Sequence, residues 1–258
     1  MSKHNSVYVA WRSLKNGSWH VVGQLTENSN NESCSFTFRY TYGALSCDDF
    51  IPFSGMQDLY RTYNSRELFP LFTNRLLSSK RPEYPVFIQW LGLDDDAGII
   101  DILGRSGGLR GTDQLQMFQR VEFRKDGSFE HIFFAHGLRH LSEGAQSRVS
   151  CLKNGEQLYL SLDCQNPTDE DAVIIRAENP AQIVGYCPRY LANDFSSFLK
   201  KDADSIKVFV ESTSQDAPIN YHLMCRLEGK ASQNKIDQYM RKKEFQAIEW
   251  DEDKQLVG

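Results

Sequence analysis

Apolar and polar residues alternate in several short stretches of the first part of the chain, at residues 7–11, 19–25 and 35–42. Such alternation is typical of β-strands that bury one face. A Lys-Asn-Gly-Ser turn at 15–18 joins the first two stretches and predicts a hairpin. Around residues 50–53 a proline is expected to hold the chain extended.

Between residues 67 and 103 the apolar spacing becomes that of a helix. We expect helices over 67–77, 84–91 and 97–103. Three aspartates at 94–96 come directly before the last of these helices, where carboxylates are favoured by the positive helix end. We therefore interpret them as a helix cap rather than as a cation site.

The second half of the chain returns to short apolar stretches. An Asp-Gly turn at 126–127 predicts a hairpin between strands at 121–125 and 129–135, and the residues that follow, to 141, also look extended. Further elements are expected as a helix at 188–199 and as strands at 158–162, 172–175, 183–186, 206–210 and 221–227. Residues 231–254 carry a thin apolar stripe, which predicts a polar helix docked on its own chain.

The change of pattern near residues 115–130 predicts two modules joined without a flexible linker. We expect an α+β protein with an N-terminal mixed α/β domain over 1–128. A small β-barrel over 129–229 follows, and a C-terminal helix or tail over 230–258 completes the chain.

The charge distribution limits how the chain can hold a partner. The 258 residues include 29 Lys and Arg against 34 Asp and Glu, which gives a formal net charge of −5. Residues 131–230 alone carry 10 basic and 13 acidic side chains. Because no segment attracts nucleic acid by a general field, any nucleic acid must be held in a local pocket.

The chain lacks several other signals. No stretch approaches the roughly 18 apolar residues of a membrane helix, and no signal-peptide core opens the chain, so we expect a cytoplasmic protein without a membrane partner. The six cysteines form no Cys-x-x-Cys pair and are expected to be free thiols. His136 and His140 have no third ligand nearby in the sequence, so we expect no metal and no cofactor.

Sequence signatures of the common enzyme classes are also missing. The chain has no nucleophile elbow, no Walker loop, no His-Glu-x-x-His helix and no kinase set. The glycine-rich stretch 104–108 lacks the strand–loop–helix context of a phosphate-binding loop and predicts a helix stop. We therefore predict no enzymatic activity.

One segment is far from generic. Residues 160–175 read Leu-Ser-Leu-Asp-Cys-Gln-Asn-Pro-Thr-Asp-Glu-Asp-Ala-Val-Ile-Ile, and 183–192 read Ile-Val-Gly-Tyr-Cys-Pro-Arg-Tyr-Leu-Ala. Asn166 and Asp169 can cap a turn through side-chain hydrogen bonds, while the proline between them fixes φ. Gly185 allows a close backbone approach. All of this is also compatible with plain scaffold in a small β-barrel.

The pair Asn-Pro-x-Asp-x-x-Ala and Ile-Val-Gly-Tyr-x-Pro-Arg resembles the HIRAN domain, and the resemblance covers about residues 130–229. HIRAN domains occur at the N-terminus of some DNA-repair and chromatin-remodelling ATPases and as a separate module in bacterial proteins. The resemblance implies an OB/SH3-like β-barrel. It also implies capture of the 3′-hydroxyl end of single-stranded DNA, as in the best understood members.

The resemblance further implies which residues bind nucleic acid: Arg139, His140, Asp169, Tyr186, Arg189 and Tyr221. Arg139 and His140, with Leu141, fall where the family has an arginine and two aromatic residues on the first strand. Asp169 is expected to accept from the terminal hydroxyl, the two arginines to meet phosphates, and Tyr221, on the last strand, to stack on a base. Because Leu141 removes a stacking surface and the module is acidic, a barrel that contacts proteins remains an open alternative.

The first part of the chain, over about residues 5–110, is similar to the small N-terminal subdomain of HipA-type serine/threonine kinase toxins. The similarity rests on the strand pattern followed by Phe-Pro-Leu-Phe-x-Asn-Arg-Leu-Leu at 69–77 and Ile-Leu-Gly-Arg-Ser-Gly-Gly at 102–108. The kinase core that should follow is missing. In some split toxin systems such a free domain acts as the antitoxin of a separate kinase, whereas a mixed α/β packing domain is the alternative.

Together these patterns predict a non-enzymatic protein that recognises single-stranded DNA 3′ ends. It is expected to work with a protein partner (a kinase, nuclease or helicase) in genome surveillance, phage defence or a toxin–antitoxin operon. The alternative is an antitoxin-like regulator that binds and restrains a separate kinase or nuclease.

Overall fold

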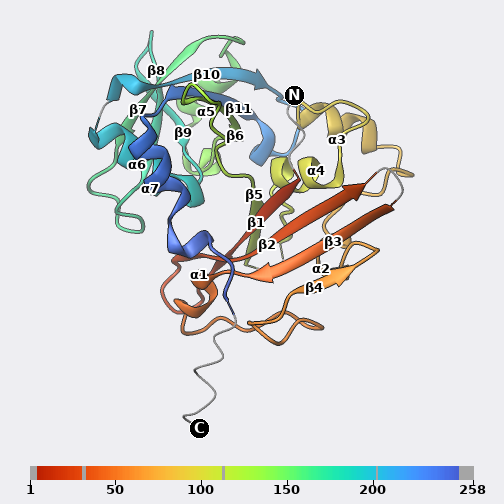
Figure 1. Cartoon of the computed structure of the whole chain (residues 1–258). Coiled ribbons are helices and arrows are strands. Elements are labelled where there is room, and N and C mark those ends of the chain that lie inside the picture. The colour runs from red at the N-terminus through yellow and green to blue at the C-terminus, as the bar shows by residue number, and fades with distance from the viewer. Residues whose placement is uncertain (1–4, 31–32, 112–113, 202, 250–258) are drawn as a thin grey trace. The chain divides into compact units, whose positions relative to one another are not determined.

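The computed structural model describes residues 5–30, 33–111, 114–201 and 203–249 and divides the chain into two units (Figure 1). Unit 1 consists of residues 1–77, 98–120 and 241–258, and unit 2 of residues 78–97 and 121–240. Each unit contains one antiparallel sheet with helices, which confirms the predicted α+β class. Among the described residues, no helix has the length and apolar character needed to span a membrane.

Unit 1 is built on a five-stranded sheet in the order β4-β3-β2-β1-β5. Its strands are β1 (Ser6–Arg12), β2 (Trp19–Asn30), β3 (Ser33–Tyr40), β4 (Tyr63–Ser65) and β5 (Leu115–Phe118). Its helices are α1 (Tyr42–Leu45), α2 (Pro70–Thr73), α4 (Ile99–Ser106) and the 3₁₀ turn η4 (Lys243–Phe245). The three alternating stretches of the sequence therefore form β1, β2 and β3, as predicted.

Aromatic rings fill the core of unit 1. Phe38 and Phe72 are fully buried, with ring centroids 5.7 Å apart. The Tyr40 hydroxyl, also buried, donates to the Met56 carbonyl at 2.7 Å and accepts from the Phe53 amide at 2.7 Å. This hydroxyl therefore satisfies two backbone groups inside the core, and burial raises the pKa of Tyr40.

The described part of the C-terminal stretch docks on its own chain, as expected: α7 (Gln233–Met240) belongs to unit 2, and residues 241–249 dock on unit 1. Ala247 forms a β-bridge with Thr41, and the Ile248 amide donates to the Tyr40 carbonyl at 2.9 Å. The Phe245 ring packs edge-on against Tyr8 with centroids 5.1 Å apart.

Unit 2 contains a six-stranded sheet in the order β6-β11-β10-β7-β8-β9. The strands are β6 (Ser128–Phe134), β7 (Gln157–Leu162), β8 (Val173–Ala177), β9 (Gln182–Tyr186), β10 (Ile206–Thr213) and β11 (Leu223–Lys230). Its helices are α3 (Tyr84–Trp90), α5 (Glu143–Ser150), α6 (Arg189–Lys201) and α7 (Gln233–Met240). Three 3₁₀ turns complete it: η1 (Leu138–His140), η2 (Ala203–Ser205) and η3 (Ile219–Tyr221).

The two outermost strands of this sheet come together. Just after β6, the His136 amide donates to the Tyr186 carbonyl at 2.8 Å, and the Tyr186 amide donates to the His136 carbonyl at 2.9 Å. Since Tyr186 ends β9, the sheet curls until its first and last strands meet at one bridge. The inner side is filled from α6, whose Phe195 and Phe198 rings lie 5.6 Å from Phe133 and Phe129 respectively.

Several predicted elements differ from the structure. The helix expected over 67–77 is reduced to the single turn α2, and the helix expected over 231–254 is the shorter α7 followed by η4. The aspartates at 94–96 do not cap α4, because its N-cap is Gly98 and no side chain accepts there. The expected strand 121–125 pairs through a single bridge, Phe123 to Phe129.

The units also interleave along the sequence. We expected domains at 1–128 and 129–229 with a tail at 230–258, whereas the structure groups 78–97 with unit 2 and 241–249 with unit 1. The reason for the first assignment lies in helix α3. Its Phe87 ring lies 6.2 Å from Tyr221, and the Trp90 indole N–H donates to an Asp216 carboxylate oxygen at 3.3 Å.

Candidate nucleic-acid interface

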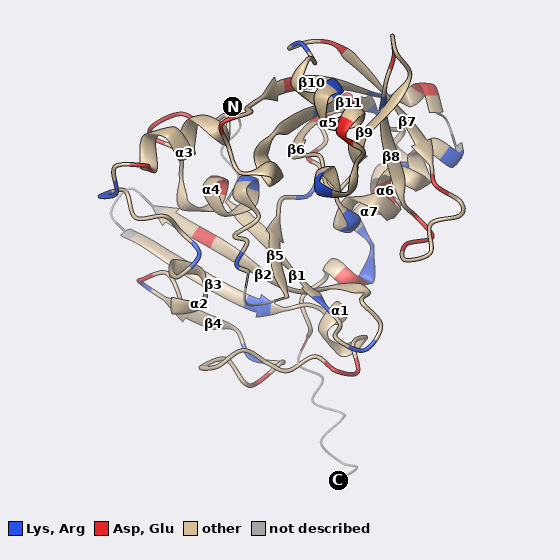
Figure 2. Cartoon of the chain, turned by 180° about the vertical axis from the view of Figure 1, so that it is seen from behind, with Lys and Arg blue, Asp and Glu red and all other residues tan. Residues whose placement is uncertain are grey.

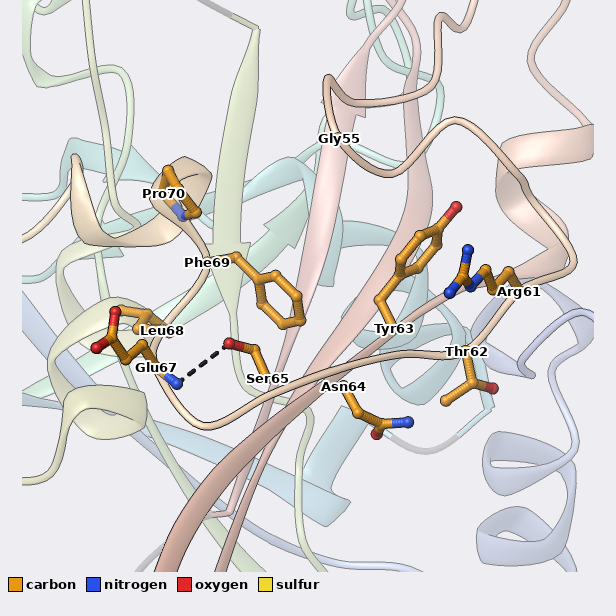
Figure 3. A pocket seen from close by; sticks show the side chains of 10 residues that line it. All are labelled: Gly55, Arg61, Thr62, Tyr63, Asn64, Ser65, Glu67, Leu68, Phe69 and Pro70. Atoms are coloured by element: carbon orange, nitrogen blue, oxygen red, sulfur yellow. Dashed lines mark hydrogen bonds between the residues drawn. The ribbon is translucent and has the colours of Figure 1, made fainter.

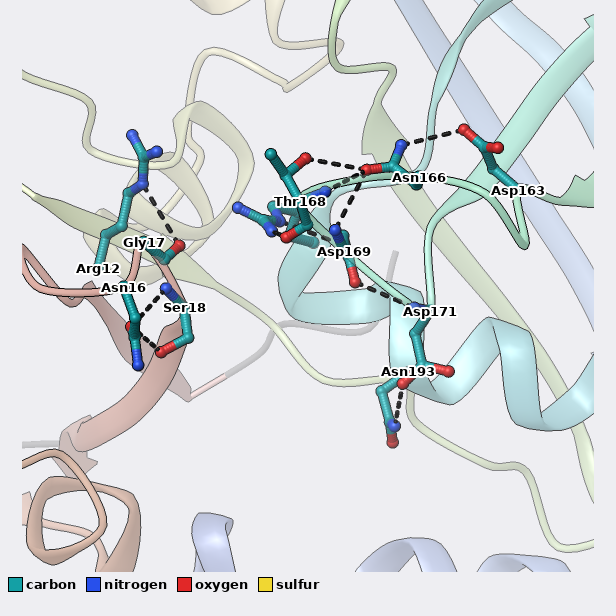
Figure 4. A network of polar contacts seen from close by, with 11 residues as sticks. Arg12, Asn16, Gly17, Ser18, Asp163, Asn166, Thr168, Asp169, Asp171 and Asn193 are labelled. Carbon is teal, nitrogen blue, oxygen red and sulfur yellow. Dashed lines mark hydrogen bonds and ion pairs between the residues drawn. The ribbon is translucent and has the colours of Figure 1, made fainter.

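The loop between β7 and β8 is fixed by the Asn166 side chain (Figure 4). Its carbonyl oxygen accepts from the amides of Thr168 and Asp169, both at 3.1 Å, and from the Thr168 hydroxyl at 2.9 Å. Its amide nitrogen donates to Asp163 Oδ2 at 3.0 Å. The turn capping predicted from Asn-Pro-x-Asp is therefore confirmed for Asn166.

Asp169 caps the same loop and also forms an ion pair. Its Oδ1 accepts from the Asp171 amide at 3.1 Å, while its Oδ2 lies 3.2 Å from Nε of Arg189. The Arg189 guanidinium additionally donates to the Thr168 carbonyl. Because Arg189 begins α6, the pair joins the loop to the start of that helix, and 18% of the Asp169 side chain and 30% of the Arg189 side chain remain exposed.

Asp171 fastens the loop further along α6. Its carboxylate accepts from Asn193 at 2.7 Å, Ser196 at 2.9 Å and Lys200 at 3.2 Å. Burial alone raises the pKa of Asp171, but these three donors outweigh burial and lower it below the ordinary value. Asp169 is thus held on a loop that is pinned at both ends.

Tyr186 reaches the opposite end of this loop. Its hydroxyl donates to Asp163 Oδ2 at 3.3 Å, the oxygen that also accepts from Asn166. Burial, and then the Asp163 charge, raise the pKa of Tyr186, so the phenol stays protonated at neutral pH. Tyr186 and Asp169 are therefore linked through Asp163 and Asn166, two residues that our sequence interpretation did not include among the site residues.

Arg139 and His140 lie on η1, a 3₁₀ turn, and not on the first strand. The prediction that residues to 141 remain extended is wrong, because Gly137 adopts φ +78° and turns the chain after the bridge to Tyr186. A Cβ at Gly137 would lie 3.2 Å from the Tyr186 ring. Both Arg139 and His140 are exposed, and η1 contacts β9 and η3.

His136 pairs with Tyr186 at the bridge and precedes the η1 turn that carries Arg139. Its ring centroid is 6.1 Å from that of Tyr190. Burial of the ring, and secondarily the charge of Arg139, lower the pKa of His136 to about 4. The imidazole is therefore neutral at pH 7, and the positive charge of this turn comes from Arg139.

Tyr221 does not lie on the last strand; it ends η3, before β11 begins. Its ring is half-buried between Phe134, at 5.1 Å, and Phe87 of α3, at 6.2 Å. Burial raises the pKa of Tyr221 to about 12. The structure therefore brings Tyr221 beside η1 but packs its ring into an aromatic cluster, which leaves little surface for a base.

The electrostatic setting is mixed. Acidic and basic residues are interspersed along both units in Figure 2. Residues 128–232 carry 10 basic and 14 acidic side chains, a difference of −4. Around this loop and turn, positive charge comes from Arg139, from the exposed part of Arg189 and from Lys200, whose side chain is 56% exposed beside Asp171.

Comparison with known families gives a match in the second half of the chain. The family model of the HIRAN domain matches residues 128–232, which confirms that this part of the chain is a HIRAN domain. The match covers most of unit 2 but neither α3 nor unit 1. The similarity of residues 5–110 to HipA-type kinase toxins stays a prediction.

Two solved structures are similar to parts of the chain. The HIRAN domain of human HLTF is 18% identical, covers 47% of this chain and 92% of its own, and has a TM-score of 0.35. A crystal structure of a protein from Lactobacillus plantarum is 17% identical, covers 40% of this chain and 97% of its own, and has a TM-score of 0.32. No curated protein matches the chain. The assignment of the HIRAN domain therefore rests on the family model.

Proposed function

We propose that the HIRAN domain at residues 128–232 binds single-stranded DNA and recognises its 3′-hydroxyl end, without catalysing a reaction. The observation that carries the proposal is the family match together with the placement of Asp169 on a pinned, partly exposed loop. Capture of such ends is the activity of the best understood domains of this family.

Asp169 retains the capacity to accept from a terminal hydroxyl. A carboxylate offers about four lone-pair directions, and only two hydrogen bonds to it are described, one on each oxygen. A hydrogen bond to a charged acceptor contributes about 1.5–3 kcal/mol when it forms. A 3′-phosphate lacks the donor and brings negative charge against the carboxylate, so the proposal includes discrimination between the two ends.

Arg139 and Arg189 are the proposed phosphate contacts. Arg139 is exposed on η1, next to the bridge that holds Tyr186, and Arg189 emerges beside Asp169. With an acidic surplus over the whole domain, these two side chains supply a local attraction rather than a general one. His140 and Tyr186 offer rings to the terminal nucleotides, a role for which Tyr221 is poorly placed.

The experiment is fluorescence anisotropy of the full chain with a labelled single strand ending in a 3′-hydroxyl or a 3′-phosphate. We expect the hydroxyl end to bind about tenfold more tightly, and Asp169→Asn to remove that preference. Asp204→Asn, at an exposed position of η2, is the matched control and should leave the preference intact. Equal binding of both ends by the wild-type chain contradicts end recognition.

A second candidate function concerns unit 1. Following the similarity of residues 5–110 to the HipA-type subdomain, we propose that this unit binds a protein partner, such as a separate kinase, and so places the chain in a toxin–antitoxin or phage-defence setting. The observation that favours a partner is the edge strand β4, against which no further strand lies among the described residues. The test is co-purification of a candidate kinase with the chain and with variants that lack one unit. A kinase that still co-purifies when unit 1 alone is deleted, and also when unit 2 alone is deleted, would count against this assignment.

A further inference from the structure

Beyond nucleic-acid binding, unit 1 carries a sheet edge that differs from the other edge of its sheet. All four residues of β5, at one edge, are buried. At the other edge, β4 pairs with β3, while Thr62, Asn64 and Arg66 are exposed. Within the described residues, no further strand lies against β4.

The alternation of hydrogen-bonded residues along β3 shows which backbone groups of β4 face away from the sheet. The Thr41 amide donates to Val22, so the odd-numbered residues of β3 bond to β2 and the even-numbered ones bond away from it. The Phe36–Ser65 and Phe38–Tyr63 pairs are therefore the hydrogen-bonded pairs between β3 and β4. The backbone N–H and C=O of Asn64 point to the open side.

A pocket of about 530 Å³ lies along this edge. Figure 3 shows the rings of Tyr63 and Phe69 on the same side of the strand as Ser65, whereas Thr62 and Asn64 point to the other side. Tyr63 is anchored, because its hydroxyl donates to the Asp58 carbonyl at 2.9 Å and accepts from the Asp58 amide at 2.8 Å. The Tyr63 ring, one of the two rings of the pocket, is thus held in place by hydrogen bonds within its own chain.

Opposite charges stand at the two ends of the pocket. The Arg61 guanidinium lies over the Tyr63 ring, 5.6 Å from its centroid, and is exposed. Glu67 lines the far end with its carboxylate, and its backbone amide donates to Ser65 Oγ at 3.1 Å. An occupant that lies along the strand therefore meets a cation at one end, rings in the middle and an anion at the other.

We propose that the open edge of β4 binds an extended peptide segment of a protein partner by adding an antiparallel strand. Backbone hydrogen bonds to Asn64 fix the register, and side chains at alternate positions enter the pocket. In the antiparallel direction the peptide places a basic residue near Glu67, an apolar residue against Tyr63 and Phe69, and an acidic residue near Arg61. The recognised class is a segment of about seven residues that carries, on one face, a basic residue toward its N-terminus, an apolar residue in the middle and an acidic residue toward its C-terminus.

The geometry offers a backbone-specific variant. Asn64→Pro removes the outward N–H but no ladder hydrogen bond to β3, and proline is tolerated at such an edge position. It also restricts Tyr63 to the extended conformation that Tyr63 already has in β4. Asn64→Ala is the matched control, because both variants lose the bond from Thr37 Oγ1 to Asn64 Oδ1, 2.8 Å long, and only the proline loses the amide.

The test selects displayed random heptapeptides on the full chain and measures the best-enriched peptide, labelled, by fluorescence anisotropy. We expect the stated charge order among selected peptides, affinity within about twofold for Asn64→Ala, and a loss of about tenfold or more for Asn64→Pro. Arg61→Glu should lose affinity for that peptide and regain it when the acidic residue is changed to lysine. Circular dichroism and the thermal midpoint report whether each variant folds.

Two results overturn the proposal. One is a selection in which no peptide sequence is enriched more strongly on the wild-type chain than on the Asn64→Pro variant. The other is a peptide that binds a folded Asn64→Pro variant as tightly as it binds Asn64→Ala. Because the site lies in unit 1, neither result bears on DNA-end binding by the HIRAN domain.

Discussion

The two sheets of this chain differ in whether their edge strands are paired. In unit 2 the first and last strands meet at the His136–Tyr186 bridge, and the candidate interface is made of the turns and loops around that closure. In unit 1 no further strand of the described residues pairs with the edge strand β4, and the binding that we propose there uses the β4 backbone. Closing a sheet removes main-chain groups as a binding surface and leaves side chains on loops to recognise a ligand.

The largest expected effect is a loss of unfolding free energy at low pH, caused by His136 at the bridge that closes the sheet of unit 2. Burial holds the pKa of His136 at about 4, below its ordinary value of 6.5, so the folded state favours the neutral ring. The associated stability is complete above pH 6.5 and is lost as the pH falls toward 4, up to about 3 kcal/mol.

Urea unfolding at several pH values measures this effect. His136→Gln should unfold with a flatter dependence between pH 6.5 and 4 than the wild-type chain, whereas the exposed control His140→Gln should follow the wild type. Parallel curves for His136→Gln and wild type would show that this ring does not supply the dependence.

The close approach at Gly185 gives the next prediction. A Cβ there would lie 2.9 Å from the Ala135 Cβ and 3.2 Å from the His136 carbonyl oxygen, so Gly185→Ala should cost about 2 kcal/mol of unfolding free energy. Gly144→Ala, in helix α5 with only an ordinary contact at 3.5 Å, should be neutral or stabilising. Chemical denaturation compares the two, and equal stabilities would contradict the described closure.

A matched pair of tyrosines sharpens the picture of unit 1. Tyr40 and Tyr63 each use one hydroxyl to donate to a carbonyl and accept from an amide, but Tyr40 is buried and Tyr63 is half-buried. Tyr40→Phe leaves two buried backbone groups without that partner and should cost about 1–3 kcal/mol. Tyr63→Phe should cost less than about 1 kcal/mol because water can replace the hydroxyl. Thermal unfolding of both variants decides.

The smallest expected effect is the salt dependence of DNA binding. With Arg139 and Arg189 as the two phosphate contacts, log K should fall against log salt with a slope of about −1.4. The dissociation constants from anisotropy titrations at 50 and 200 mM salt should then differ by about sevenfold. Arg139→Ala should reduce the slope by about half, while Lys207→Ala, at an exposed position of β10, should leave it unchanged. A slope several times steeper would show that more than these two side chains contact phosphates.

Regular alternation made most strands predictable: β1 and β3 follow the sequence pattern closely, whereas β2 starts at Trp19 as predicted but continues past residue 25 to Asn30. Helix α5 was missed because only Ala145 and Val149 of its eight residues are buried, too few for a recognisable stripe. Strand β4 has three residues and an exposed centre, so it left no hydrophobic signal either.

The part of the candidate site that is fixed by hydrogen bonds between residues close in sequence was predictable. The Asn-Pro-x-Asp turn specified Asn166 and Asp169 directly, because the bonds of Asn166 to Thr168 and Asp169 span only two or three residues. The positions of Arg139 and Tyr221 depend on a positive φ at Gly137 and on Phe87, which lies far away in the sequence. Neither could be inferred from spacing alone.

The central claim is that Asp169 reads the terminal hydroxyl of a single strand. The most direct measurement compares the wild-type chain with two labelled strands that are identical except that one ends in a 3′-hydroxyl and the other in a dideoxynucleotide. Removing one hydrogen bond to a carboxylate should weaken binding about tenfold, and Asp169→Asn should bind both strands alike. Equal affinity of the wild-type chain for the two strands would contradict the claim.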